Sequence, residues 1–222
     1  MAARSGNANG DHGALMDGNY RYQRHIYDLT RKYYLLGRDR LIDEIEARPG
    51  QTILELGCGT GRNLRLTAKL YPQTRLFGLD ISAQMLATAR AKFRGEDLSH
   101  KITLVKGDAA RFSAADFGQG GFDHVFISYA LSMIPDWEGT LDAASEALNP
   151  GGALHIVDFG SAARLPRFFQ NGLRSWLARY HVSPRDSLRE VAESFCEQKG
   201  LNLRFDSAFR DYAQFLKLTR PS

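Results

Sequence analysis

The sequence is short of cysteine and has no long hydrophobic run, and each shortage excludes a class of protein. Its two cysteines, Cys58 and Cys196, cannot build the disulfide framework of a small secreted domain, so we expect a reducing compartment. Neither cysteine resembles a metal ligand, and we expect no metal site. No segment approaches the roughly 18 apolar residues of a membrane-spanning helix. Any contact with a membrane should therefore be peripheral.

The first thirteen residues also lack an apolar stretch. Gly, Asn, Ala and Ser dominate residues 1–13, which predicts a disordered tail and not a signal peptide. We therefore expect the chain to stay in the cytoplasm. Of the 222 residues, 43% are hydrophobic, which suffices for the core of one domain with an N-terminal appendage. The net charge of +4 permits an anionic partner, either nucleic acid or an anionic lipid surface, without choosing between them.

Strand-like and helical patterns alternate through the middle of the chain. Apolar runs predict strands at 52–56, 74–79, 102–106, 122–128 and 153–158. Helical patterns lie between them at 63–70, 82–93 and 137–148. Crossover helices are how parallel strands connect, so the alternation predicts a parallel sheet with helices on both faces. The Asn-Pro-Gly-Gly segment at 149–152 is predicted to be the turn before the fifth strand.

The two ends of the chain follow other patterns. One face of an N-terminal helix is indicated by Tyr22, Ile26, Leu29, Tyr33 and Leu36, and a second short helix is expected over 38–47. Beyond the fifth strand, an apolar stripe with interspersed arginines predicts an amphipathic helix over 165–180. The last two predicted strands, 201–207 and 212–218, read as a hairpin.

A glycine-rich loop follows the first predicted strand. Residues 55–61 have the pattern Glu-x-Gly-x-Gly-x-Gly, which lets bare backbone approach a flat ligand because no Cβ stands in the way. The dinucleotide-binding pattern needs a glycine where this chain has Arg62, so a pyrophosphate site is not matched. Asp80 ends the next strand, about 20 residues further on, where an acid can meet ribose hydroxyls. A nucleoside without a pyrophosphate is indicated.

Together with Gly107, Asp108 and Ala109 after the third strand, this loop and acid resemble the class I S-adenosylmethionine-dependent methyltransferases. The resemblance implies an α/β, Rossmann-like sheet of seven strands with an antiparallel last strand. It implies a helical cap over 14–50, a methyltransferase domain over 51–222, and S-adenosylmethionine as cofactor. The cofactor-binding positions that it implies are Arg38, Glu55, Gly57, Cys58, Gly59, Gly61, Asn63, Asp80, Ile81, Met85, Asp108, Ala109 and Ser128.

Methyl transfer from a sulfonium is an in-line displacement, so the protein mainly aligns donor and acceptor and excludes water. An aromatic face stabilises positive charge as it moves to the acceptor, which makes aromatic residues near the site important. The candidates are Tyr20, Tyr22, Tyr27, Tyr129 and Trp137. Tyr129 is the best placed, just beyond the carboxyl end of the fourth strand. The segment 128–131 lacks the Pro-Pro-aromatic signature of enzymes that methylate nucleobase amino groups, which disfavours nucleic acid and favours an amine, an enolate-like carbon or a hydroxyl.

A closer resemblance lies in residues 20–31, 36–42, 128–137 and 157–160, which are similar to the bacterial N-methyltransferases of betaine-lipid synthesis. That resemblance implies three methylations of diacylglyceryl-homoserine at the inner face of the membrane, with Tyr129, Tyr22 and Tyr27 holding the amine. The alternative is a phosphatidylethanolamine, quinone or other small-molecule methyltransferase, because these relatives share Tyr27 and Asp28. A non-catalytic protein of the same fold is disfavoured by the intact glycine loop. The sequence makes no prediction of oligomeric state.

The predicted helix over 165–180 has two interpretations. A lipid substrate favours a helix at the headgroup boundary, with aromatic residues entering it and arginines on anionic lipid. A helix of this fold more commonly buries such a stripe against the sheet, and that outcome is the first expectation.

Overall fold

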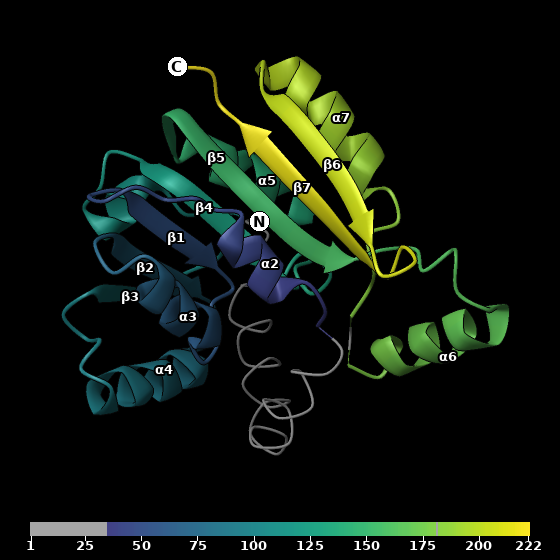
Figure 1. Ribbon diagram of the computed structural model, residues 1–222, viewed down its shortest axis with the longest axis horizontal. Helices are drawn as coiled ribbons and strands as arrows, with labels where there is room; N and C mark the ends of the chain where they lie inside the picture. Colours follow the sequence, from purple (N-terminus) through teal and green to yellow (C-terminus); the bar gives the residue numbers. More distant parts are fainter. Residues whose placement is uncertain (1–34, 181) are drawn as a thin grey trace, which may run out of the picture.

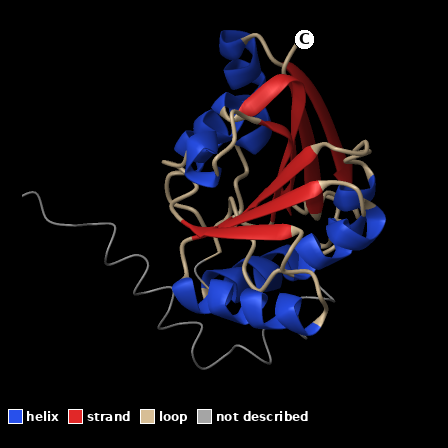
Figure 2. Ribbon diagram, turned by 90° about the vertical axis from the view of Figure 1, so that its left-hand side faces the viewer, coloured by secondary structure: helices blue, strands red, loops and turns tan. Residues whose placement is uncertain are grey.

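The computed structural model describes residues 35–180 and 182–222, which form a seven-stranded sheet with helices on both sides (Figures 1 and 2). The strands are β1 Thr52–Leu56, β2 Arg75–Asp80, β3 Ile102–Lys106, β4 Phe122–Ser128, β5 Leu148–Phe159, β6 Asn202–Ala208 and β7 Ala213–Thr219. Their order across the sheet is β3-β2-β1-β4-β5-β7-β6, and β7 is antiparallel to both of its neighbours. The predicted fold, with its antiparallel last strand and its C-terminal hairpin, is confirmed.

Helices cover both faces and bury a separate apolar core on each. They are α2 Arg38–Asp43, α3 Arg62–Leu70, α4 Ala83–Gly95, α5 Trp137–Glu146, α6 Arg167–Ala178 and α7 Leu188–Lys199, with a 3-10 turn, η1, at Ala114–Phe117. Residues of α5 and α7 pack into one core and residues of α2, α3 and α4 into the other. The central strands β1 and β4 contribute to both cores, because successive side chains of a strand point to opposite faces.

The predicted end of the short helix before β1 and the predicted turn before β5 are wrong. The short helix expected over 38–47 ends at Asp43, because Glu46 adopts a left-handed φ of 53° and Arg48 precedes a proline. The turn expected over 149–152 is part of β5. There the register against β4 shifts, and Gly151, at a φ of 75°, lets the strand bulge while its N–H still bonds the carbonyl of Arg220.

The tail predicted over 1–13 and most of the cap predicted over 14–50 lie outside the described residues. The same is true of the predicted N-terminal helix up to its last positions, Leu35 and Leu36. Within the described part of the chain, no helix is both long and apolar enough to cross a membrane.

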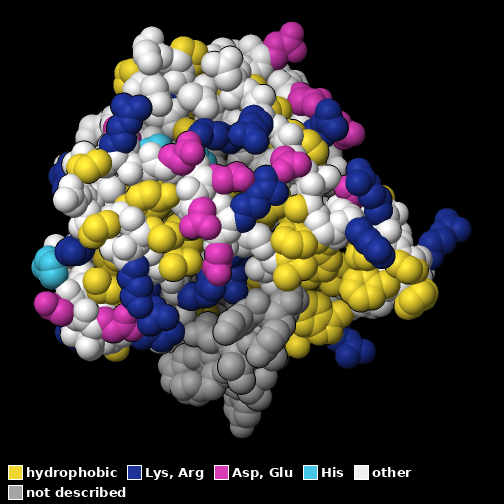
Figure 3. Space-filling model, in the orientation of Figure 1, with side chains coloured by type: hydrophobic (Ala, Val, Ile, Leu, Met, Phe, Trp, Pro, Cys, Tyr) yellow, Lys and Arg dark blue, Asp and Glu magenta, His cyan; other side chains and the backbone are white. Residues whose placement is uncertain are grey.

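Helix α6 is not buried against the sheet, which contradicts the first expectation for the 165–180 segment. It extends away from the ends of β5 and β7 in Figure 1, and within α6 only Leu177 is fully buried. Phe168 and Phe169 are 79% and 46% exposed. Figure 3, in the orientation of Figure 1, shows an apolar area at the lower right, where Figure 1 draws α6. The stripe packs on the domain only through its inner edge, at Leu173 and Trp176 among others.

Candidate active site

The glycine loop joins β1 to α3 and depends on glycine at three positions. Gly57, Gly59 and Gly61 have φ values of 70°, 54° and 77°, in the left-handed region that side chains disfavour. A Cβ on Gly61 would lie 2.3 Å from the ring of Phe93, and one on Gly57 would lie 2.7 Å from the Cβ of Ala130. A Cβ on Gly59 would meet nothing within 4 Å. Two glycines therefore allow close packing, while the third borders open space.

Asp80 ends β2 beside this loop and holds it in place. Its Oδ2 accepts a hydrogen bond of 2.7 Å from the backbone N–H of Gly59, and its Oδ1 accepts one of 2.9 Å from that of Ser82. Each carboxylate oxygen can accept more than one hydrogen bond. Asp80 can therefore fix the loop and still receive hydroxyl groups of a ligand lying along Gly59.

Glu55, at the end of β1, is a buried carboxyl group beneath the loop. Its Oε1 accepts a hydrogen bond of 2.8 Å from Asn63 Nδ2, whereas its Oε2 is buried without a partner among the described residues. Burial raises the pKa of Glu55 to about 8, and the bond from Asn63 and the charge of Arg38 oppose that rise. Buried polar atoms are nearly always paired, so the orphaned oxygen indicates a hydrogen-bond donor or cation supplied by a ligand.

Arg38 and Ser128 approach the same region from α2 and β4. Arg38 is buried at the start of α2, and its Nε donates to the carbonyl of Leu35 at 3.3 Å. Burial raises the pKa of both Glu55 and Tyr129, and the positive charge of Arg38 opposes each rise, so Arg38 lies close to both groups. The Oγ of Ser128 is buried without a partner among the described residues.

The other predicted cofactor residues line the same edge of the sheet in different ways. The backbone of Cys58 bonds the carbonyl of Leu79 at 3.0 Å, but its thiol packs in the core. Burial raises the pKa of that thiol, so Cys58 serves the loop through its backbone. Ile81 and Met85 follow β2, and Asp108 and Ala109 follow β3.

Tyr129 is more deeply enclosed than its place after β4 suggested. Its side chain is only 3% exposed, and its ring packs edge-on against Phe159 with centroids 4.7 Å apart. The hydroxyl donates a hydrogen bond of 2.6 Å to the carbonyl of Leu36, and the backbone has a left-handed φ of 54°. A non-glycine residue strained in this way commonly marks a functional site. Its partners in the prediction, Tyr22 and Tyr27, lie outside the described residues.

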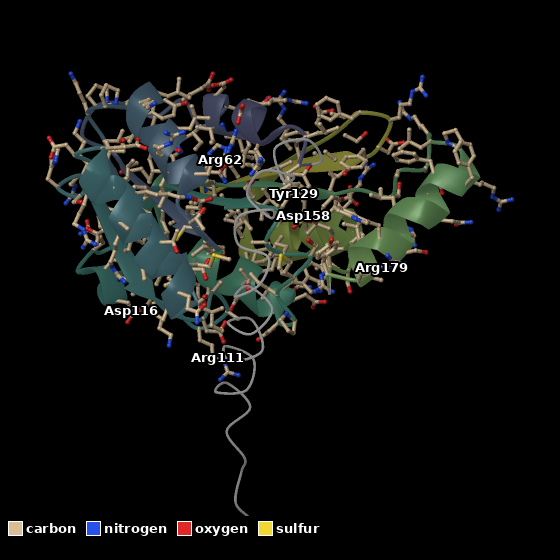
Figure 4. All side chains as sticks on the ribbon, turned by 90° about the horizontal axis from the view of Figure 1, so that it is seen from below. Arg62, Arg111, Asp116, Tyr129, Asp158 and Arg179 are labelled. Carbon is tan, nitrogen blue, oxygen red and sulfur yellow. The ribbon has the colours of Figure 1, made fainter. Side chains whose placement is uncertain are left out.

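Sequence reasoning did not select Asp158, at the carboxyl end of β5 near Tyr129 (Figure 4). Asp158 is fully buried, and it accepts hydrogen bonds from the backbone N–H groups of Ser132 and Phe159 at 3.0 and 2.7 Å. Burial raises its pKa to about 6. The sequence did hold a signal for Asp158, because it is an acid at the carboxyl end of a strand, at the edge where such sheets bind ligands. Asp80 was selected from the same position in β2.

The segment after β4 is held by Arg185 as well as by Asp158. The guanidinium of Arg185 donates to the carbonyls of Leu131 and Ile134 at 3.1 and 2.7 Å. Residues 130–134 are thus fixed over the site from two sides. No motif of the sequence pointed to Arg185, because its contacts join segments about fifty residues apart.

Comparison with known proteins decides the kind of domain. A family described as a methyltransferase domain matches residues 53–152. Residues 53–152 form a methyltransferase domain. This methyltransferase domain runs from β1 into β5 and contains the glycine loop, Asp80, Asp108 and Tyr129. Arg38, α6 and the C-terminal hairpin lie beyond the matched residues.

Curated relatives are similar to the chain over part of its length. The demethylmenaquinone methyltransferase of Listeria welshimeri is 28% identical over 138 residues, which are 62% of this chain and 57% of the relative. That of Lactobacillus johnsonii is 31% identical over 138 residues, which are 60% of this chain and 55% of the relative. The chain thus spans a little over half the length of the relatives it matches.

Solved structures agree with the fold of the methyltransferase domain. Phosphoethanolamine N-methyltransferase 2 of Haemonchus contortus, in complex with S-adenosyl-L-methionine, superposes with a TM-score of 0.72 at 16% identity. The match covers 95% of this chain and 60% of that one. A putative methyltransferase of Haloferax volcanii, in complex with its Trm112 activator, gives a TM-score of 0.69 at 20% identity and covers 93% and 97% of the two chains. At these identities the likeness concerns the fold alone.

Proposed function

We propose that this chain is an S-adenosylmethionine-dependent methyltransferase whose acceptor is carried by a membrane lipid. The observation that carries the first part is the unpaired, buried Oε2 of Glu55 beneath a loop that is open at Gly59. The methionine part of the cofactor brings an ammonium group, which would supply the missing donor. The names of the relatives and the family match of residues 53–152 support the same assignment.

The residues at this edge of the sheet would each bind a different part of the cofactor. Glu55 would receive the ammonium group and Arg38 the carboxylate, since the carboxyl group of Glu55 lies close to the positive charge of Arg38. Asp80 would accept the ribose hydroxyls, because it already lies along the backbone of Gly59. Asp108, after β3, would read the adenine amino group. When bound, the cofactor supplies an electrophilic methyl group on a sulfonium sulfur.

The chain's own contribution to the transfer is alignment and exclusion of water. The segment 130–134 is fixed by Asp158 and Arg185, so it can form a rigid wall beside the acceptor. The Tyr129 hydroxyl joins this segment to the residues just before α2 by its hydrogen bond to the carbonyl of Leu36. Because displacement at a methyl group needs reacting atoms held in line, such rigidity contributes directly to the rate.

Two lipid-borne acceptors have separate support. The relatives named demethylmenaquinone methyltransferase favour a quinone, and they give this acceptor the stronger support of the two. The similarity of residues 128–137 and 157–160 to betaine-lipid N-methyltransferases favours the amino group of diacylglyceryl-homoserine. In that case Tyr129, with Tyr22 or Tyr27, would stabilise the nitrogen as it becomes permanently positive.

One experiment tests the function and separates the acceptors. The full chain is incubated with methyl-labelled S-adenosylmethionine and detergent micelles that contain a reduced demethylated quinone, diacylglyceryl-homoserine or phosphatidylethanolamine. Mass spectrometry then counts the methyl groups added to each lipid. A quinone acceptor predicts one methyl group on the ring, whereas the homoserine lipid predicts up to three on nitrogen. Cofactor binding with no transfer to any of the three lipids would contradict the lipid-borne acceptor, and absence of cofactor binding would contradict the whole proposal.

A further inference from the structure

Helix α6 exposes aromatic side chains that the rest of residues 35–180 and 182–222 does not cover. Phe168 is 79% exposed and Phe169 is 46% exposed, although a buried position would stabilise each of them. Both lie on the outer part of the stripe whose inner edge, Leu173 and Trp176, packs on the domain. Exposed aromatic residues grouped on one helix indicate a surface that binds another molecule or a membrane.

The charged residues of the segment that contains α6 have one sign. Residues 159–180 contain four arginines and no acidic residue. Two of the four form ion pairs, Arg164 with Asp211 at 3.1 Å and Arg174 with Asp186 at 2.9 Å. Within residues 35–180 and 182–222, Arg167 and Arg179 form no ion pair, and their charge is available to a partner. Figure 3 shows Lys and Arg side chains bordering the apolar area at this end of the molecule.

The position of α6 links it to the candidate active site. The helix follows the carboxyl end of β5, the edge of the sheet that also carries Asp80 and Tyr129 (Figure 1). The segment between β5 and α6 is fastened to the β6–β7 turn, because the N–H groups of Gly160 and Ala162 bond the carbonyls of Tyr212 and Asp211, each at 2.8 Å. Phe209, in the same turn, is 49% exposed. A molecule that covers α6 therefore lies at the same edge of the sheet as the candidate active site.

We propose that α6 docks on the surface of an anionic lipid membrane, with Phe168 and Phe169 in the headgroup boundary and Arg167 and Arg179 on lipid phosphates. Aromatic side chains flanked by arginines, with no acid among them, match the requirements of such a surface. A second copy of the chain is a poorer occupant, because a symmetric contact would bring the arginines of both copies together without an acidic partner from this segment. Docking here deepens the proposed function, since it would present a lipid-borne acceptor to the site.

Sedimentation with vesicles tests the docking surface without any acceptor or methyl transfer. The full chain is mixed with vesicles of phosphatidylcholine alone or of phosphatidylcholine with phosphatidylglycerol. We expect binding to the anionic vesicles and little to the neutral ones, with a decrease as salt rises because the charges are screened. The double variant Phe168→Ala/Phe169→Ala should lose about tenfold or more in affinity, and Arg167→Glu/Arg179→Glu at least as much.

Matched variants at the opposite edge of the sheet serve as controls. Leu70→Ala removes an apolar side chain that is 45% exposed, and Arg75→Glu/Arg94→Glu makes the same change in net charge as the arginine pair of α6. Both controls should bind anionic vesicles like the unaltered chain, and all variants should keep their affinity for S-adenosylmethionine.

Equal losses of vesicle affinity in the control and α6 variants would overturn the proposal, as would absence of binding at low salt. So would a dimer in light scattering that Phe168→Ala/Phe169→Ala dissociates. Because the vesicles hold no acceptor, a failure of the proposed transfer would leave this result unaffected.

Discussion

The hydroxyl of Tyr129 donates a hydrogen bond of 2.6 Å to the carbonyl of Leu36, and this bond joins the segment after β4 to the start of α2. Tyr129 is buried and Leu36 is partly buried, so the tyrosine has a structural role in addition to any contact with an acceptor. Arg38 follows Leu36 by two residues and lies close to Glu55 and Tyr129. The position of the helix that carries a candidate cofactor ligand therefore depends on Tyr129.

Replacing Tyr129 by phenylalanine should cost about 1 kcal/mol of unfolding free energy, because the Leu36 carbonyl loses its donor while the ring keeps its packing. Replacement by alanine should cost about 3–5 kcal/mol, since it also leaves a cavity beside Phe159. Urea unfolding of the two variants measures both effects. Methyl transfer should be measured in both variants. Loss of activity in the alanine variant alone could come either from a lost acceptor contact or from a damaged core, and the phenylalanine variant keeps the core. Equal stability of all three proteins would contradict the structural role.

Replacing Asp80 by alanine should weaken binding of S-adenosylmethionine and of its demethylated product about tenfold or more. The change removes a charged acceptor of hydrogen bonds, which contributes about 1.5–3 kcal/mol, and frees the N–H of Gly59. Titration calorimetry measures the loss. The control is Asp116→Ala, an exposed acid of η1 that bonds only within its own turn among the described residues. An Asp80→Ala variant with unchanged affinity would exclude Asp80 from the cofactor site.

Cofactor binding should release a proton from Glu55. Burial raises its pKa to about 8, so the group is mostly protonated at pH 6–7.5, whereas a bound ammonium favours the carboxylate. Affinity for S-adenosylmethionine should therefore rise about tenfold per pH unit over this range, and Glu55→Gln should bind more weakly with a flat profile. Calorimetry in buffers of different ionisation enthalpy counts the proton directly. No proton release by the unaltered chain would show that Glu55 does not meet the ammonium group.

A half-buried and a buried histidine, paired across β4 and β5, should favour unfolding in mild acid. His124 and His155 lie on β4 and β5 with Nδ1 and Nε2 3.3 Å apart, and burial lowers their pKa values to about 4 and about 3, with Lys217 adding to the decrease. Below about pH 6.5 the unfolded chain binds protons at both histidines that the folded chain does not bind, so the pair lowers the free energy of unfolding as pH decreases toward 4, whereas the raised pKa values of Glu55 and Asp158 oppose that decrease. Urea unfolding at pH 7, 6 and 5 measures the decrease. A His124→Gln/His155→Gln variant should show a smaller one, and an equal slope in both proteins would contradict this origin.

Local patterns predicted most of the sheet and much of the site. Strands β1, β3 and β4 have the predicted bounds, because each is a short apolar run between clear turn signals. The glycine loop and Asp80 were found for the same reason, since their spacing reflects one strand, one turn and one crossover helix. The extent of β5 was missed because its Pro-Gly-Gly segment is read locally as a turn. Leu148 before this segment pairs with β4, and Ala153 after it pairs with both β4 and β7, so the segment stays within the strand.

The sequence by itself determined the alternation of strands and helices and the acids that close β1 and β2, because these depend on residue type and spacing along one segment. The antiparallel last strand was implied by the resemblance to a known family. Only the tertiary structure decided the burial of Tyr129, the network of Asp158 and Arg185, and the exposure of α6. Each of these depends on which distant segments share the same space. A stripe of apolar residues on a helix predicts that something covers it, but whether the sheet does so is a property of the assembled fold.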